Sequence, residues 1–212
     1  MTVITVLGPR SDFGGRIETQ VERALDVLRY ETRPYTIKLH HHTRLACIET
    51  RAEYVETLTL LLGFYRPLDR WLAASLAPAR VELGLERRAR GPLIRRDLDA
   101  LGVTLAMLRF HPAPLRTSVP YALGWLYGIE IAALGDRILG KRLSEELGIA
   151  PDRGGAFFDG HGANTHAMWE RLTTTISSRV VREDECAAAC TGAVDFFEAL
   201  TDWLSLPPLA AA

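Results

Sequence analysis

Three consecutive histidines, His40, His41 and His42, are the first candidates for chemistry in the sequence. Imidazole nitrogens bind haem iron and other transition metals, so a histidine on a helix can serve as an axial haem ligand. Successive residues on a helix point about 100° apart, so the three rings cannot all face one metal ion. At most one or two of them can point into a pocket, and a histidine at the surface or the edge of the core is the simpler interpretation.

Two further groups of side chains could bind a ligand. Cys186 and Cys190 are spaced as i and i+4, which can hold a metal ion, but the alanines between them favour helix packing. A run of arginines suggests a phosphate-binding patch, although acidic neighbours favour a solvated helix end. The arginines are Arg87, Arg88, Arg90, Arg95 and Arg96, and the acidic residues are Glu86, Asp97 and Asp99.

The bulk composition limits the class of protein. Hydrophobic residues make up 48% and charged residues 24% of the 212 residues, a balance that argues against disorder. The formal net charge of −1 provides no global basic field for nucleic acid. The chain has no signal-like start and no apolar run of about 18 residues. We therefore predict a cytoplasmic protein that binds neither nucleic acid nor a membrane.

Helical periodicity dominates the chain, and TVITVL near the start is the only run typical of a strand. We expect Pro34 to kink or restart the first helix, Pro67 to bend the third, and 109–120 to be a connector. The prediction is an all-α, single-domain fold of six to nine helices over 16–206, with 1–15 as an extension and 207–212 as a tail. The predicted helices cover 16–33, 35–49, 52–76, 92–108, 119–147, 164–180 and 184–205.

Four stretches, in order, resemble motifs of one family. They are LRYETRPYT (28–36), RRARGPLIRRDLDALG (87–102), ALGWLYGIEIAALGDRILGKRL (122–143) and GAFFDGHGANTHAMW (155–169). Together they resemble the haem oxygenase superfamily, in particular the compact biliverdin-producing enzymes found with bacterial phytochromes. The resemblance covers about residues 25–205.

The resemblance implies a multi-helix fold in which haem lies between a proximal and a distal helix. Haem would be both substrate and cofactor, and its ring would be opened to biliverdin, carbon monoxide and ferrous iron. An electron-donor reductase would be the redox partner, and a bacterial phytochrome is a further candidate partner.

The proximal position departs from the family pattern. An ungapped alignment of LRYETRPYT places Thr36 where the family has its iron-binding histidine, and a neutral hydroxyl is a weak iron ligand. His40 lies one helical turn later on the same face, so it could ligate a haem displaced by about one turn. Arg29 matches the basic residue that would bind a haem propionate, whereas Glu170 stands where a basic residue is common.

The distal pattern is partly kept. Gly135 matches a glycine that lets the distal backbone approach haem and oxygen. Ile131 stands where the family has another glycine, and its branched side chain would fill part of the oxygen pocket. Ala132 replaces a serine, and Asp136 replaces the second residue of a glycine pair.

Two hypotheses of equal weight follow. The first is a divergent haem oxygenase that uses His40 as metal ligand and Gly135 for distal approach. The second is a non-catalytic member that binds a linear tetrapyrrole, another apolar ligand or a protein partner, because Thr36 and Ile131 replace functional residues. A non-haem metal protein built from the histidine triplet, His161 and His166 has much lower weight.

Overall fold

The computed structural model describes residues 13–79, 83–105 and 107–207, and most of these residues are helical, with no strand among them. The predicted all-α fold is therefore confirmed. The TVITVL run and most of the predicted extension and tail lie outside the described residues. The helices are α1 Phe13–His42, α2 Arg51–Leu76, α3 Leu85–Arg88, α4 Arg90–Ala100, α5 Val119–Leu147, α6 Ala156–Asp159, α7 Thr165–Arg179 and α8 Glu183–Leu204.

The predicted restart of the first helix at Pro34 is wrong. α1 continues through Pro34 to His42, so the predicted separate helix over 35–49 is wrong, and a short 3-10 turn, Arg44–Cys47, follows instead. Proline removes one N–H and leaves the carbonyl of Tyr30 without its helical partner. Both Pro34 and Tyr30 are exposed, so water can satisfy that carbonyl and the helix can continue.

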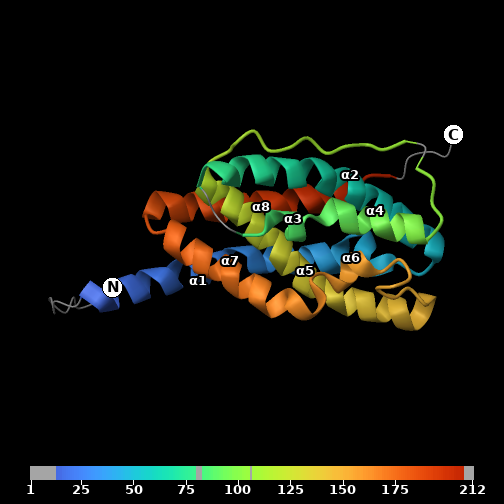
Figure 1. The fold of residues 1–212 in the computed structure, drawn as a ribbon, viewed down its shortest axis with the longest axis horizontal. Helices are drawn as coiled ribbons and strands as arrows, with labels where there is room; N and C mark the ends of the chain where they lie inside the picture. Colours follow the sequence, from blue (N-terminus) through green and yellow to red (C-terminus); the bar gives the residue numbers. More distant parts are fainter. Residues whose placement is uncertain (1–12, 80–82, 106, 208–212) are drawn as a thin grey trace, which may run out of the picture.

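The helix predicted over 92–108 is also too long, because α4 ends at Ala100. Gly102 adopts φ +72°, and the N–H of Val103 bonds the carbonyl of Leu98 at 3.0 Å, which is a typical helix-terminating arrangement. The described residues of 103–118 then follow an extended path along α2 (Figure 1). The N–H of His111 bonds the carbonyl of Gly63 at 3.1 Å, which fixes this segment to α2.

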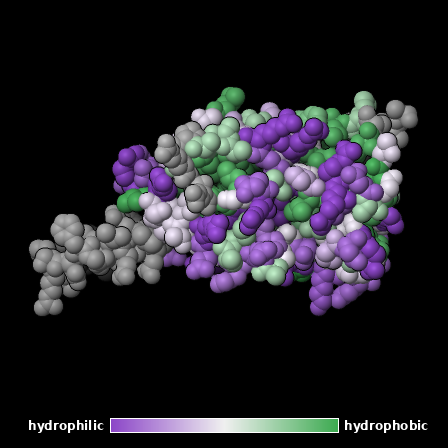
Figure 2. Space-filling model, viewed as in Figure 1, coloured by the Kyte–Doolittle hydropathy of each residue, from purple (hydrophilic) through white to green (hydrophobic). Residues whose placement is uncertain are grey.

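The core lies where α5 packs against α8, and α1 packs against α8 and also contacts α5 (Figure 1). Edge-to-face aromatic contacts fill it, as between Trp125 and Phe196, whose ring centroids are 5.8 Å apart. The visible face of the molecule is largely hydrophilic, with separated apolar spots (Figure 2). Within the described residues, no helix combines the length and the apolar character that crossing a membrane requires.

Two carboxylates, one half-buried and one buried, accept hydrogen bonds from backbone N–H groups at the start of a neighbouring helix. Asp69 of α2 accepts the backbone N–H groups of Arg90 and Gly91 at 3.1 and 2.8 Å. Asp97 of α4 accepts those of Ala156 and Phe157 at 2.9 and 2.7 Å. Burial raises the pKa of the Asp69 carboxyl to about 6 although these N–H groups and Arg90 oppose the shift. These bonds fix α4 and α6 relative to α2, and so position the loops that carry the polar residues described below.

Candidate functional site

His40 of α1 faces Gly135 of α5. Its Nδ1 lies 3.0 Å from the carbonyl oxygen of Thr36, so Nδ1 carries the proton and the ring turns Nε2 toward α5. A Cβ atom on Gly135 would lie 2.5 Å from both Cε1 and Nε2 of His40, so only glycine allows this approach. Nε2 is buried and makes no hydrogen bond among the described residues, and Asp136 Oδ1 lies 3.6 Å from it. The structure thus brings together His40, Gly135 and Asp136.

Asp136 favours the charged form of His40. Burial by itself lowers the pKa of His40, but the carboxylate of Asp136, helped by the backbone of Thr36 and Ala132, outweighs it and raises that pKa above 6.5. A neutral imidazole with its proton on Nδ1 offers the Nε2 lone pair to a metal, whereas the protonated ring does not. Proton and metal therefore compete for the same nitrogen.

We predict a pH-dependent stability that depends on His40. Because its pKa is raised on folding, its stabilising contribution is complete below the unfolded value of 6.5 and is lost as pH rises through the folded value. The free energy of unfolding, measured by urea denaturation between about pH 5 and 8, should fall with rising pH. His40→Gln should remove part of this slope, whereas the exposed His41→Gln should not. Equal slopes in wild type and His40→Gln would contradict the prediction.

The other residues predicted for the site are brought together only in part. The Thr36 hydroxyl donates to the carbonyl of Thr32 at 3.1 Å, within its own helix. Ile131 is half-buried against the core, and Ala132 is buried beside the His40 contact. Arg29 is 72% exposed and pairs with Asp26 at 3.1 Å, and Glu170 is exposed as well. The binding roles of all these residues remain predictions.

A buried charged cluster, Arg88–Glu130–His161, lies deeper in the same region and was missed by the sequence analysis. Arg88 Nη1 lies 2.6 Å from Glu130 Oε1, and His161 Nε2 lies 2.9 and 3.0 Å from the two carboxylate oxygens. Arg88 also donates to the carbonyls of Leu83 and Met168 at 2.9 and 2.6 Å. The cluster therefore joins α3 and α5 to α7 and the loop before it.

The charges in this cluster keep Glu130 ionised. Burial by itself raises the pKa of its carboxyl, but the hydrogen bond from His161 and the charges of Arg90, His161 and Arg88 outweigh burial and hold the pKa below 4.5. The prediction of a solvated helix end is thus wrong for Arg88 and Arg90, which are 3% and 1% exposed. In the sequence, Arg88 belongs to the arginine run, His161 to the non-haem metal hypothesis and Glu130 to the stretch 122–143, and nothing connects the three residues.

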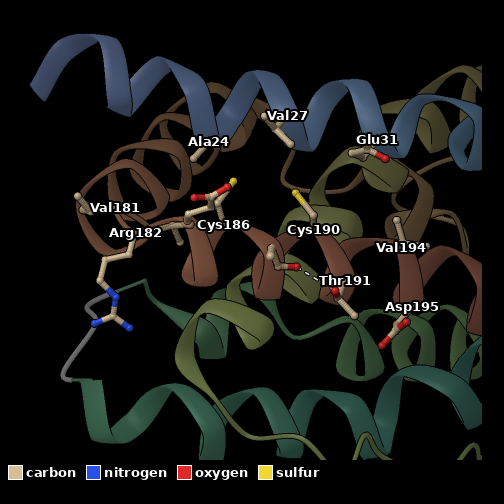
Figure 3. Close-up of a pocket in the computed structure, with 13 residues that line it drawn as sticks. Ala24, Val27, Glu31, Val181, Arg182, Cys186, Cys190, Thr191, Val194 and Asp195 are labelled. Atoms are coloured by element: carbon tan, nitrogen blue, oxygen red, sulfur yellow. Dashed lines mark hydrogen bonds between the residues drawn. The ribbon is translucent and has the colours of Figure 1, made fainter. Parts of the chain in front are cut away.

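Cys186 and Cys190 line a separate cavity of about 600 Å³ between α1 and α8 (Figure 3). Burial, followed by the proximity of the Cys186 thiol, raises the pKa of Cys190 to about 12, which keeps that thiol protonated and unreactive at neutral pH. Ala24 and Val27 of α1 form an apolar wall opposite, with Glu31 at one side. Both cysteines also pack against the core, as helix-packing residues do.

The histidines do not converge on a metal site in the part of the chain that the structure describes. No group of three or more His, Cys, Asp or Glu side chains there has the arrangement that holds a metal ion. His161 is bound to Glu130, whereas His41, His42 and His166 are exposed. The non-haem metal hypothesis therefore has no ligand set among these residues.

Comparison with known proteins gives one informative result. No protein-family model and no curated protein matches the chain. Among solved structures, the chain is similar to the NO- and CO-bound haem oxygenase from Neisseria meningitidis, at 22% identity and a TM-score of 0.60. The match covers 93% of this chain and 94% of that enzyme. The chain therefore has the fold of that haem oxygenase.

Proposed function

We propose that this chain, which has the fold of a haem oxygenase, is a divergent haem oxygenase-like protein that holds haem between α1 and α5. The observation that carries the proposal is the Nε2 atom of His40, which is buried, lacks a hydrogen-bond partner among the described residues and faces Gly135. A buried nitrogen without a partner is costly, and a metal ion would satisfy it. His40, rather than Thr36, would then hold the haem iron.

The donor atoms of His40 fit haem iron, but haem fits between α1 and α5 only if the two helices move apart. Nδ1 of His40 is held by the Thr36 carbonyl at 3.0 Å, which is the second contact that an iron-binding histidine needs. The ring of His40 lies directly against Gly135, so α1 and α5 must separate by the thickness of a porphyrin. Ile131 replaces a glycine of the family pattern, and its side chain narrows the same space.

Bound haem would supply both the ring that is cleaved and the iron that activates oxygen, giving biliverdin, carbon monoxide and ferrous iron. The residues of this chain have simpler tasks. His40 binds in its neutral form, Gly135 permits close backbone approach, and the small Ala132 keeps that surface open. Arg29, freed from Asp26, binds a propionate at the edge. An electron-donor reductase and, as product acceptor, a bacterial phytochrome are the partners, in the cytoplasm.

A second candidate function has an observation of its own. In the structure Nε2 of His40 lies 3.6 Å from Oδ1 of Asp136, and the His40 ring fills the space beside Gly135, so the gap between α1 and α5 is closed there. A non-catalytic protein would keep this contact and bind a linear tetrapyrrole, another apolar ligand or a protein partner. The cavity between α1 and α8 in Figure 3, which has both apolar and charged lining residues, offers such a protein a separate binding site.

A hemin titration followed by absorption tests the proposal. Wild-type protein should give a saturable Soret band, and His40→Ala should weaken binding by more than the roughly 10- to 100-fold typical of outer-shell changes at metal sites. The exposed neighbour His41→Ala is the matched control and should bind as wild type does. With a reductase and NADPH, the bound haem should be converted to biliverdin.

Thr36→His separates the two candidates. It restores the histidine of the family pattern without touching His40, which lies one turn away. If only Thr36→His binds hemin, while wild type binds biliverdin or neither ligand, the haem oxygenase proposal fails and the non-catalytic function stands. If wild type binds hemin and His40→Ala binds it equally well, the assignment of His40 as ligand fails.

A further inference from the structure

A cavity of about 980 Å³ lies between α3 and α4 on one side and α6 and α7 on the other. It shares no residue with the His40–Gly135 contact, and its volume lies within the range of small-molecule sites. Three arginines from three helices line it, namely Arg87 of α3, Arg96 of α4 and Arg171 of α7.

The side chains of Arg87, Arg96 and Arg171 are all exposed, and none is in an ion pair with a described residue. Arg88 pairs with Glu130 at 2.6 Å, and Arg95 pairs with Asp99 at 3.1 Å. Among the described residues, the side chains of Arg87, Arg96 and Arg171 have no ion pair or hydrogen bond of this kind. The arginines of 87–96 therefore have different environments in the fold. Some guanidinium groups are bound in the interior, and others face the cavity.

A fourth guanidinium lies behind the cavity wall. Arg90 is 1% exposed, and both its Nη1 and Nη2 are buried without a hydrogen-bond partner among the described residues. Nη1 lies 3.8 Å from the position that a Cβ on Gly160 would take, and Gly160 is part of the cavity lining. Gly160 has φ +66°, which favours glycine, so no side chain separates Arg90 from this wall. The carboxylates of Glu130 and Asp69 are close enough to interact with the charge of Arg90, but neither is hydrogen-bonded to its Nη1 or Nη2.

The acidic residues of the cavity lining do not balance the charge of its three arginines. Glu86 and Asp159 also face the cavity, which leaves three arginines against two carboxylates. Oδ2 of Asp159 lies 3.2 Å from the position of a Cβ on Gly162, so this carboxylate lies against the turn before α7. His161, the remaining titratable side chain of the lining, is already bound to Glu130.

We propose that this cavity binds a small phosphorylated molecule, with Arg87, Arg96 and Arg171 as its direct contacts and Arg90 adding positive charge from behind. The planar fork of a guanidinium matches two oxygens of a phosphate group. α7 begins at this wall, and its N-terminal partial charge has the same sign as the arginines. The site goes beyond the proposed haem function, since it uses different residues and binds its ligand without haem.

Calorimetric titration of the full chain with pyrophosphate tests the inference. Wild type should show saturable binding, and Arg96→Ala and Arg171→Ala should each weaken it by about 10-fold, because one charge-assisted hydrogen bond contributes about that much. Arg95→Ala is the matched control on the same helix, because Arg95 is bound to Asp99, and it should bind as wild type does. Circular dichroism of each variant checks that the helices are intact.

Three outcomes would overturn the inference. The first is a flat titration of wild type with pyrophosphate. The second is an equal loss of affinity in Arg95→Ala and Arg96→Ala, which would indicate unspecific charge attraction. The third is citrate binding as tightly as pyrophosphate, which would exclude a preference for phosphate. None of these results bears on hemin binding, so this inference and the haem proposal fail independently.

Discussion

Glu130→Ala is expected to destabilise the protein by about 3–5 kcal/mol, because it leaves buried charge without a partner. Glu130 is 4% exposed and accepts hydrogen bonds from Arg88 at 2.6 Å and from His161 at 2.9 Å. Its removal leaves the Arg88 guanidinium in the interior with only backbone carbonyls, and Arg90 loses a nearby negative charge. Urea denaturation at neutral pH should show the loss as a lower midpoint with an unchanged slope.

Two control variants distinguish the cost of an unpaired buried charge from the smaller cost of losing an ordinary ion pair. Asp99→Ala breaks the exposed pair with Arg95 and should change stability by about 1 kcal/mol or less. The double variant Arg88→Met with Glu130→Leu removes both buried charges and should recover much of the lost stability. A Glu130→Ala midpoint close to that of Asp99→Ala would show that Arg88 reaches water when its partner is gone, against the burial seen here.

The predictability of the helices depends on local signals. The predicted helix over 119–147 coincides with α5, because Pro120 lies in its first turn and Gly148 takes φ +66° just past its end. The predicted helix over 92–108 overran, because its apolar periodicity continues beyond Gly102, where the chain turns. The apolar residues after Gly102 pack against the core from an extended segment, and periodicity alone does not distinguish that from a helix.

The sequence predicted only those site residues that a local spacing or a matched motif connects. The i, i+4 relation of Thr36 and His40 placed His40 as an alternative ligand, and the fold brings it to Gly135 of α5. The Arg88–Glu130–His161 cluster joins residues 42 and 31 positions apart, and no spacing rule connects them. The same limit applies to Arg96 and Arg171, which are far apart in the sequence and line one cavity in the fold.

Gly124→Ala is the second change with a large expected effect. It should destabilise the protein by about 3 kcal/mol or more, at the upper end of the usual cost of overpacking a core or above it. Gly124 lies where α5 crosses α8, and a Cβ there would overlap the carbonyl oxygen of Ala189 and lie 2.9 Å from the backbone nitrogen of Ala193. Backbone atoms cannot rotate aside as a side chain can, so the two helices must move apart along the main core interface.

Gly140→Ala on the same helix is the matched comparison for this prediction. A Cβ on Gly140 would lie 3.1 Å from the Cβ of Phe158, which a small shift of the short helix α6 relieves. Alanine also favours the helix by about 1 kcal/mol over glycine, so Gly140→Ala should be nearly neutral. Urea denaturation of both variants should therefore give a difference of about 3 kcal/mol or more. Equal midpoints would mean that α5 and α8 can separate freely at Gly124, and the close backbone contact would then not determine how these two helices pack.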